Sequence, residues 1–226
     1  MILESIDFSP LWISVKTGLA ASVVSFFLGI AAAEFVVGRK GKVRAVWDAV
    51  LTMPMVLPPT VAGYILLRIF STRRPFGHFL GNSLGIQVIH TWLGCVVAAT
   101  VIAFPLMYRN ARAAFEQIDE NVIFAAQTLG ISEWHIFWKI RMPMAKPGII
   151  SGLTLTFARA MGEYGATSML AGNIAGKTST ISQQIAMVIQ SGDYKTAGFW
   201  CIGISVISFV CIIAINLLCN TRRNKK

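Results

Sequence analysis

Two oppositely charged side chains, four residues apart, are the first candidates for chemistry in this sequence. Arg159 and Glu163 lie in the apolar stretch TFARAMGEYGAT, where a helix would place them on one face. Either charge costs roughly 3 kcal/mol to leave in lipid, so both should face protein or water. The spacing predicts a structural ion pair or part of a polar path, with Thr167 nearby. Because Glu163 cancels much of the field of Arg159, the pair alone identifies no substrate.

A second candidate, the segment AGNIAGKT at residues 171–178, matches the relaxed pattern of a phosphate-binding loop. In such a loop, backbone amides and a lysine, here Lys177, bind nucleotide phosphates. The motif normally follows a buried strand, whereas this segment follows an apolar span, and the sequence has no second acidic strand for magnesium. We therefore interpret its glycines as turn residues of an outer loop.

Metal-ligand and catalytic patterns do not stand out in the sequence. His78, His90 and His135 lie far from one another, without cysteine or carboxylate partners at ligand spacing. Asp48 and Glu116 lie in or beside predicted cytoplasmic loops and are expected to be solvated. The cysteines fall in apolar spans and are interpreted as small packing residues. These cysteines are Cys95, Cys201, Cys211 and Cys219.

The elements that carry these residues are predicted to be membrane helices. Of the 226 residues, 55% are hydrophobic and only 13% charged, which leaves too little polar surface for a soluble domain of this size. Several apolar runs reach the roughly 20 residues that cross a bilayer core. We expect an all-α, polytopic bundle of about five transmembrane helices, forming one domain over residues 1–226. The expected spans are about 11–37, 46–70, 86–108, 147–171 and 197–219.

The basic residues predict the orientation of these spans. With the N-terminus outside, thirteen lysines and arginines fall in cytoplasmic segments and four in outer loops. This bias follows the positive-inside rule and predicts an outer N-terminus and a cytoplasmic C-terminus, in a multi-pass protein of the plasma or inner membrane. The positive-inside distribution thus explains the net charge of +10, and no nucleic-acid partner is expected. The cytoplasmic set includes Arg222, Arg223, Lys225 and Lys226.

The second span contains the proline cluster TMPMVLPPTVAG, in which Pro58 and Pro59 are adjacent. A proline inside a helix removes a hydrogen bond, so this span should be bent or partly opened. In lipid such a break persists only where protein or a water-filled path covers the freed carbonyls. The cluster therefore indicates either a packing kink or a break that lines a translocation pathway.

The predicted cytoplasmic loop, residues 109–146, begins its helical part with a short helix of small residues. Residues 121–129 favour this helix, in which Ala125 and Ala126 leave a shallow surface. Gly130 is suited to the left-handed position that follows the last helical turn. The segment is expected to present a small, rigid knob to a partner in the cytosol.

An aromatic helix is expected to follow the knob. Ser132 is suited to cap it, and Trp134 and Trp138 share one face. Pro143 is expected to end this helix and Pro147 to begin the fourth span. The aromatic face would lie at the membrane interface and anchor the knob just below the bilayer.

The loop resembles the cytoplasmic signature of binding-protein-dependent ABC importer permeases. That signature reads Glu-Ala-Ala, three residues, Gly, nine residues, Ile, one residue, Leu-Pro. The positions that match here are Ala125, Ala126, Gly130, Ile140 and Pro143. Phe124 stands where glutamate is usual, and Met142 replaces leucine. The resemblance extends over roughly residues 10–220, where PMVLPPTVAGYILL, FPLMYRNARAAFEQID and PGIISGLTLTFARAMGEYGAT are similar to molybdate permease subunits.

This resemblance implies a noncatalytic permease subunit that forms a homodimer in the lipid bilayer. A cytoplasmic ATPase dimer, which would bind ATP and magnesium, is expected to dock on the helix at residues 125–130. An extracytoplasmic binding protein would deliver an oxyanion, expected to be molybdate, with tungstate and sulfate as alternatives. A translocation pathway past Pro58, Pro59, Arg159, Glu163 and Thr167 is expected. The rival interpretations are an ion-coupled secondary transporter that uses Arg159 and Glu163, and a membrane enzyme that uses residues 171–178.

Overall fold

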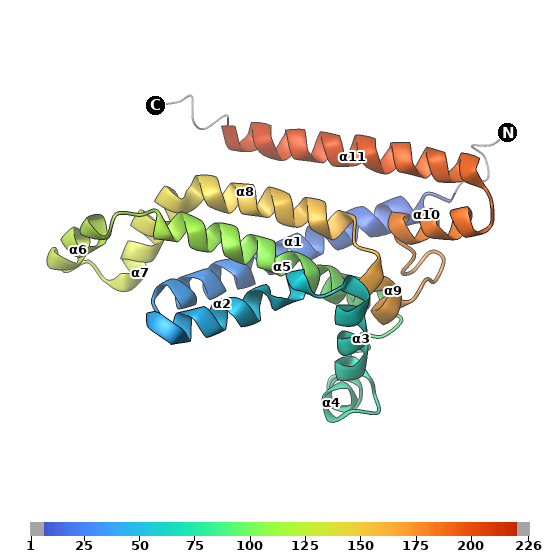
Figure 1. The fold of residues 1–226 in the computed structure, drawn as a ribbon, viewed down its shortest axis with the longest axis horizontal. Helices are drawn as coiled ribbons and strands as arrows, with labels where there is room; N and C mark the ends of the chain where they lie inside the picture. Colours follow the sequence, from blue (N-terminus) through green and yellow to red (C-terminus); the bar gives the residue numbers. More distant parts are fainter. Residues whose placement is uncertain (1–6, 221–226) are drawn as a thin grey trace.

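Helices of unequal length make up residues 7–220, the part of the chain that this computed structural model describes (Figure 1). Within that part every regular element is helical, which confirms the predicted all-α class. The elements are α1 (Ser9–Val37), α2 (Gly41–Val56), α3 (Pro59–Phe70), α4 (Pro75–Ser83), α5 (Trp92–Glu116), α6 (Glu120–Thr128), α7 (Glu133–Ile136), the π-helical η2 (Phe137–Arg141), α8 (Met142–Met161), α9 (Gly165–Ala171), α10 (Ile181–Gln190) and α11 (Tyr194–Asn220).

The core of the bundle consists of α1, α5 and α8, which lie side by side (Figure 1). Small residues let these helices approach closely, as is typical of helix packing in membranes. A Cβ atom on Gly29 of α1 would lie 2.7 Å from Cγ of Met107 on α5, and one on Gly18 would lie 2.9 Å from Sδ of Met161 on α8. The three helices therefore form the rigid frame against which the other elements are placed.

Three helices are long and apolar enough to cross a membrane, namely α1, α5 and the first part of α11. The pair α2 and α3 passes the same test as one broken span, with a bend of 108°. The predicted fourth span is also interrupted, because α8 ends at Met161 and α9 begins at Gly165. The described residues thus contain several candidate spans, and the number five stays a prediction.

The helix that carries the third predicted span begins and ends later in the chain than that span. It was expected at residues 86–108, but α5 begins at Trp92 and continues to Glu116. Gly85 and His90 both have positive φ angles, of 66° and 57°, so the segment before α5 cannot be helical there. At the other end, RNARAAFE consists mostly of good helix formers and extends α5 into the predicted cytoplasmic loop.

Pro143 does not end the aromatic helix, and Pro147 does not begin the next one. Instead α7, η2 and α8 continue into one another from Glu133 to Met161. In a regular helix the ring of Pro143 would clash with the carbonyl four residues earlier. The wider π turn of η2, in which the N–H of Met142 donates to the carbonyl of Phe137, lies directly before this proline and relieves the clash.

The two ends of the bundle carry different elements. In Figure 1, α6 and α7 lie at one end, and α3, α9 and α10 lie at the other. The last helix, α11, packs on α10 and α8 and leaves large apolar side chains such as Ile202 and Phe209 exposed. Cys219 and the basic residues Arg222, Arg223, Lys225 and Lys226 fall outside the residues whose side chains the structure describes.

Candidate functional site

The two broken helices meet at their breaks. The extended Leu57 separates α2 from α3, which confirms the predicted bend at the proline cluster. A Cβ atom on Gly165 of α9 would lie 3.0 Å from Cβ of Pro59, and one on Gly63 of α3 would lie 2.7 Å from Cα of Ala166. The half-helices α3 and α9 therefore pack almost backbone against backbone, at the position where each span is interrupted.

Pro58 and Pro59 reduce the number of hydrogen-bond donors that this break leaves unpaired. Neither residue has an N–H group, so the interruption leaves no donor unpaired at these two positions. The carbonyl of Pro58 accepts bonds from the N–H groups of Val61 and Ala62, at 2.9 and 3.1 Å, and so starts α3. The end of α2 stays open, since Val56 is 83% exposed in the single chain.

The second break is held by Glu163. Its Oε2 lies 2.7 Å from Nη1 of Arg159, and its Oε1 accepts the N–H of Ala166 at 2.8 Å. One carboxylate thus joins the last turn of α8 to the first turn of α9. Its side chain is only 2% exposed, whereas that of Arg159 is 34% exposed, so the pair is closed on one side and open on the other.

Thr167 lies one turn beyond Glu163, on α9, and is buried. The structure therefore brings together the five residues predicted for the pathway around two adjacent breaks: Pro58 and Pro59 on one side, Arg159, Glu163 and Thr167 on the other. The predicted ion pair is present. A role of these residues in translocation stays a prediction.

The segment at residues 171–178 forms a closed turn. The N–H groups of Lys177, Thr178 and Ser179 all donate to the carbonyl of Ile174, at 3.0, 2.9 and 3.1 Å. A phosphate-binding loop needs such amides free to point at its ligand. The interpretation of the glycines as turn residues agrees with this geometry, because Gly172 and Gly176 have φ angles of 67° and 70°.

The helix predicted as a knob ends as expected. Asp119 caps α6 by accepting the N–H of Asn121 at 2.9 Å. Gly130 has a φ of 73°, its N–H donates to the carbonyl of Gln127, and the N–H of Ile131 donates to that of Ala126. These two bonds form the paired C-terminal motif that favours glycine, so Gly130 fixes the end of α6 as expected.

Ser132 stands at the N-cap of α7 but makes no capping bond. Its hydroxyl group lies 2.8 Å from Nδ1 of His135 instead. The first turn of α7 is therefore stabilised through a side chain on the same turn, and the expectation of a backbone cap by Ser132 was wrong.

The five residues that match the loop signature have different surroundings. Ala126 is buried with Ile136, and Ile140 packs against the same cluster, so these residues hold α6 on the aromatic helix. Ala125 is exposed and Gly130 makes the turn. Pro143 lies at the start of α8.

The exposed surface of the knob includes two large apolar side chains among polar ones. Phe124 is 57% exposed and Leu129 is 78% exposed, on either side of Ala125. Exposed apolar patches of this kind are typical of protein interfaces.

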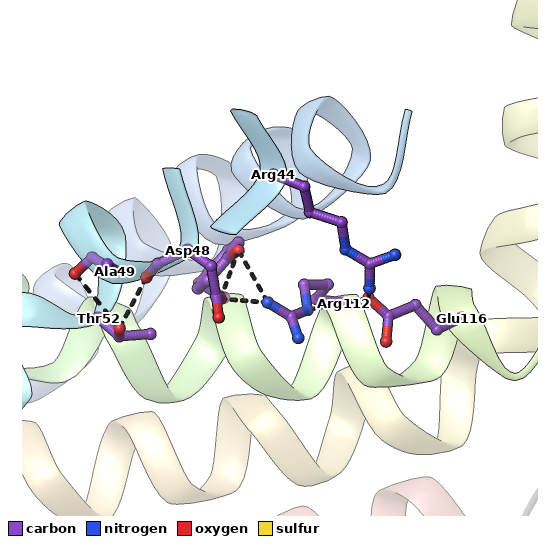
Figure 2. Close-up of polar contacts among 7 residues, drawn as sticks. Arg44, Asp48, Ala49, Thr52, Arg112 and Glu116 are labelled. Atoms are coloured by element: carbon purple, nitrogen blue, oxygen red, sulfur yellow. Dashed lines mark hydrogen bonds and ion pairs between the residues drawn. The ribbon is translucent and has the colours of Figure 1, made fainter. Parts of the chain in front are cut away.

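A charged network links α2 to α5 and was missed by the sequence reasoning (Figure 2). Arg44 on α2 pairs with Glu116 on α5, and Asp48 on α2 pairs with Arg112 on α5. Nε of Arg112 also lies 2.9 Å from Oε1 of Glu116, and the hydroxyl group of Tyr108 donates to Asp48 at 3.0 Å. Asp48 and Glu116 are thus ion-paired and not merely solvated. The four-residue spacing of Arg112 and Glu116 predicts their contact within α5, but it does not predict the pairs with α2.

A further ion pair, between Glu34 on α1 and Arg141 on η2, joins the end of the first helix to the π-helical turn. Among the described residues, no group of three histidine, cysteine or acidic side chains is placed to hold a metal ion.

The apolar helices, the paired breaks and the helical knob define a multi-pass membrane transport subunit. The chain belongs to the family described as binding-protein-dependent transport system inner membrane component, whose family model matches residues 25–221. It is therefore a permease subunit of an ABC importer, and the resemblance stated from the loop signature is confirmed.

Several curated relatives cover most of the chain. It is 36% identical over 226 residues to the molybdenum transport system permease protein ModB of Escherichia coli (strain K12), covering 100% of this chain and 99% of the relative. The ModB of Haemophilus influenzae is 33% identical over 97% of this chain and 96% of its own length. The sulfate transport system permease protein CysT of Escherichia coli (strain K12) is 32% identical over 91% of this chain and 74% of the relative.

Two solved ABC importers share the fold. A chain of the MetNI methionine ABC transporter in an inward-facing conformation matches 94% of this chain and 94% of its own length, with a TM-score of 0.72 and 16% identity. A chain of a bacterial ABC transporter that imports the acidic polysaccharide alginate matches 96% of this chain and 80% of its own length, with a TM-score of 0.72 and 17% identity. At these identities the likeness concerns the fold alone.

Proposed function

We propose that this chain is the permease subunit through which an ATP-driven importer translocates molybdate. The observation that carries the choice of substrate is the match to ModB of Escherichia coli along the whole of both chains, at 36% identity. The sulfate relative CysT is 32% identical and leaves about a quarter of its own length unmatched. Tungstate and sulfate, tetrahedral oxyanions like molybdate, are the alternative substrates.

The proposed assembly is a homodimer of this chain with a cytoplasmic ATPase dimer and an extracytoplasmic binding protein. The chain itself is noncatalytic and holds no cofactor, while ATP and magnesium bind to the ATPase. The exposed apolar side chains of Phe124 and Leu129, on a helix whose end is fixed by Gly130, support α6 as the surface on which the ATPase docks.

In the proposed orientation the N-terminus lies outside and the C-terminus in the cytosol. Basic residues near α6 support it, because Arg39 and Lys40 lie between α1 and α2, and Lys42 and Arg44 lie in the first turn of α2. The opposite end of the bundle, with α9 and α10, then faces the binding protein.

The pathway is proposed to pass the two adjacent breaks, along Pro58, Pro59, Arg159, Glu163 and Thr167. Discontinuous helices are a common device for polar paths at membrane depth, since their ends are covered by protein or water. The carboxylate of Glu163 neutralises Arg159, so this region holds no fixed excess of positive charge. A path that must release its oxyanion benefits from such weak binding.

The direct test is reconstitution of the chain with its ATPase and binding protein in lipid vesicles. Molybdate uptake is expected only when ATP, magnesium and the binding protein are all present. The degree to which excess tungstate or sulfate inhibits this uptake measures the preference of the transporter among the three oxyanions. Uptake by this chain alone, driven by an ion gradient, would show the secondary-transporter mechanism and contradict the proposal. ATP hydrolysis by the isolated chain, abolished by Lys177→Ala, would support the membrane-enzyme alternative.

A further inference from the structure

The helix α2 is attached to the bundle in an unusual way. It forms one half of the broken span, yet none of its side chains is buried. Apolar residues such as Val46, Met53 and Val56 are exposed in the single chain. Within the described chain, the neighbours of α2 are mainly α5 and, to a smaller extent, α1. Apolar packing of α2 against the frame is limited to Leu51, which is partly buried at the main core cluster, and to Trp47, whose ring centroid lies 5.4 Å from that of Phe35 on α1.

Two cross-helix ion pairs add to this limited packing and join α2 to α5 (Figure 2). Arg44 and Asp48 are one helical turn apart on α2, and Arg112 and Glu116 are one turn apart on α5. The pairs Arg44–Glu116 and Asp48–Arg112 connect them in antiparallel order. We call these four residues the α2 clasp.

The order of charges in the α2 clasp fixes one register. On α2 the charges read positive then negative, and on α5 they also read positive then negative, so the antiparallel arrangement places opposite charges together. A shift of α2 by one turn along α5 would bring Asp48 to Glu116 or, in the other direction, Arg44 to Arg112. Like charges in contact are destabilising, so both shifted registers are disfavoured.

The clasp is also suited to open. Its side chains are between about a quarter and two fifths exposed, so water can replace each contact. Exposed ion pairs are weak individually, which means that a modest force can separate them. A well-packed apolar contact would resist the same displacement more strongly.

The α2 clasp borders the knob. Arg44 and Glu116 line a cavity of about 450 Å³, and Ile123, Phe124 and Gln127 of α6 line its other side. A displacement of α6 by a cytosolic partner therefore changes the space next to the clasp directly, without a relay through the core.

We propose that the α2 clasp is a positioning device for transport, which locks α2 in one register on α5 and releases it when α6 is displaced. Arg112 is the central positioning residue, because it contacts both Asp48 and Glu116. This inference rests on the proposed function of the chain as an ATP-driven permease, since that function supplies the force on α6.

The test compares charge reversals in the complete transporter. Reversal on α2 alone, with Arg44→Glu and Asp48→Arg, places like charges opposite one another. Reversal on both helices, with Arg112→Glu and Glu116→Arg added, restores every pair. The single-helix reversal is expected to lower molybdate uptake per ATP hydrolysed by at least about fivefold, the lower end of typical coupling between linked sites. The double reversal is expected to restore most of that loss. Lys42→Gln, which removes an exposed charge of α2 outside the clasp, is the matched control.

A second readout does not depend on uptake. Spin labels at Val50 on α2 and Ala113 on α5, in a background without native cysteines, report the distance between the two helices with and without ATP. The wild-type distance is expected to be narrow without nucleotide and to change with it, while Arg112→Gln broadens it in both conditions.

The outcomes separate the two proposals. Unchanged uptake per ATP in the single-helix reversal, or failure of the double reversal to restore it in a folded complex, would overturn the clasp. A wild-type complex without ATP-driven uptake would overturn the proposed function, and the label distances in Arg112→Gln would still decide whether the clasp positions α2.

Discussion

The two halves of the broken span are held in opposite ways. α3 lies against α9 through Gly63 and Gly165, where a single added carbon would meet the neighbouring helix. α2 has no fully buried side chain, and two ion pairs with α5 supplement its few apolar contacts. Close backbone packing resists displacement, while partly exposed ion pairs are individually weak. We therefore expect α3, which follows the break, to be rigid and α2, which precedes it, to be mobile.

The largest effect is expected from filling the contact between α3 and α9. A Cβ atom on Gly63 would lie 2.7 Å from Cα of Ala166 and 2.9 Å from Cβ of Met169. Gly63→Leu should therefore separate the half-helices and lower the free energy of unfolding by about 3 kcal/mol, the upper range for overpacking. Thermal unfolding in detergent measures this change. Gly198→Leu, at a helical glycine of α11 with nothing within 4 Å, is the control, and equal melting of the two variants would contradict the rigid contact.

A smaller loss is expected from removing the carboxylate at the second break. Glu163→Ala removes both the ion pair with Arg159 and the acceptor for the N–H of Ala166. The expected loss is about 2 kcal/mol, less than for a fully buried pair because Arg159 is partly exposed. Glu163→Gln keeps an acceptor for Ala166 and should lose less. If both variants melt together, the bond to Ala166 does not hold α9.

An intermediate loss of stability is expected from a substitution at the end of α6. Gly130→Val places a β-branched side chain at a φ of 73°, which costs roughly 1–2 kcal/mol and should fray the end of α6. Binding of the ATPase and coupled uptake are expected to fall together, while α3 and α9 stay in place. Gly130→Asn, which tolerates this backbone conformation, should keep most of both activities. Normal uptake by a correctly assembled valine variant would count against docking on α6.

The smallest effect is expected at the edge of the clasp. Tyr108→Phe removes one hydrogen bond to Asp48 and leaves both cross-helix ion pairs. Stability should change by less than about 1.5 kcal/mol, the usual net contribution of one hydrogen bond. Uptake per ATP hydrolysed should fall less than in the single-helix charge reversal. A larger loss than in that reversal would place the control of α2 at Tyr108 and not at the ion pairs.

Local chemistry made the knob and the proline break predictable from sequence. Gly130 closes α6 because a left-handed residue is needed there. The adjacent Pro58 and Pro59 both lack an N–H donor, and the span is bent by 108° at this position. The spacing of Arg159 and Glu163 likewise predicted their ion pair.

Contacts between distant segments were beyond the same reasoning. The pairing of Asp48 with Arg112 joins residues 64 positions apart, and the contact of Gly63 with Ala166 joins the two breaks, so neither depends on a local pattern. The continuation of the helix past Pro143 was also missed, because it depends on a π turn that adapts the preceding backbone.

The most direct test measures both halves of the span in one transporter. Spin labels on Val50 and Ala113 report the distance between α2 and α5, and labels on Ile65 and Met169 report that between α3 and α9, with and without ATP in the reconstituted complex. The account predicts that ATP changes the first distance and leaves the second unchanged. A change confined to α3 and α9, or no change at either pair during ATP-driven uptake, would contradict it.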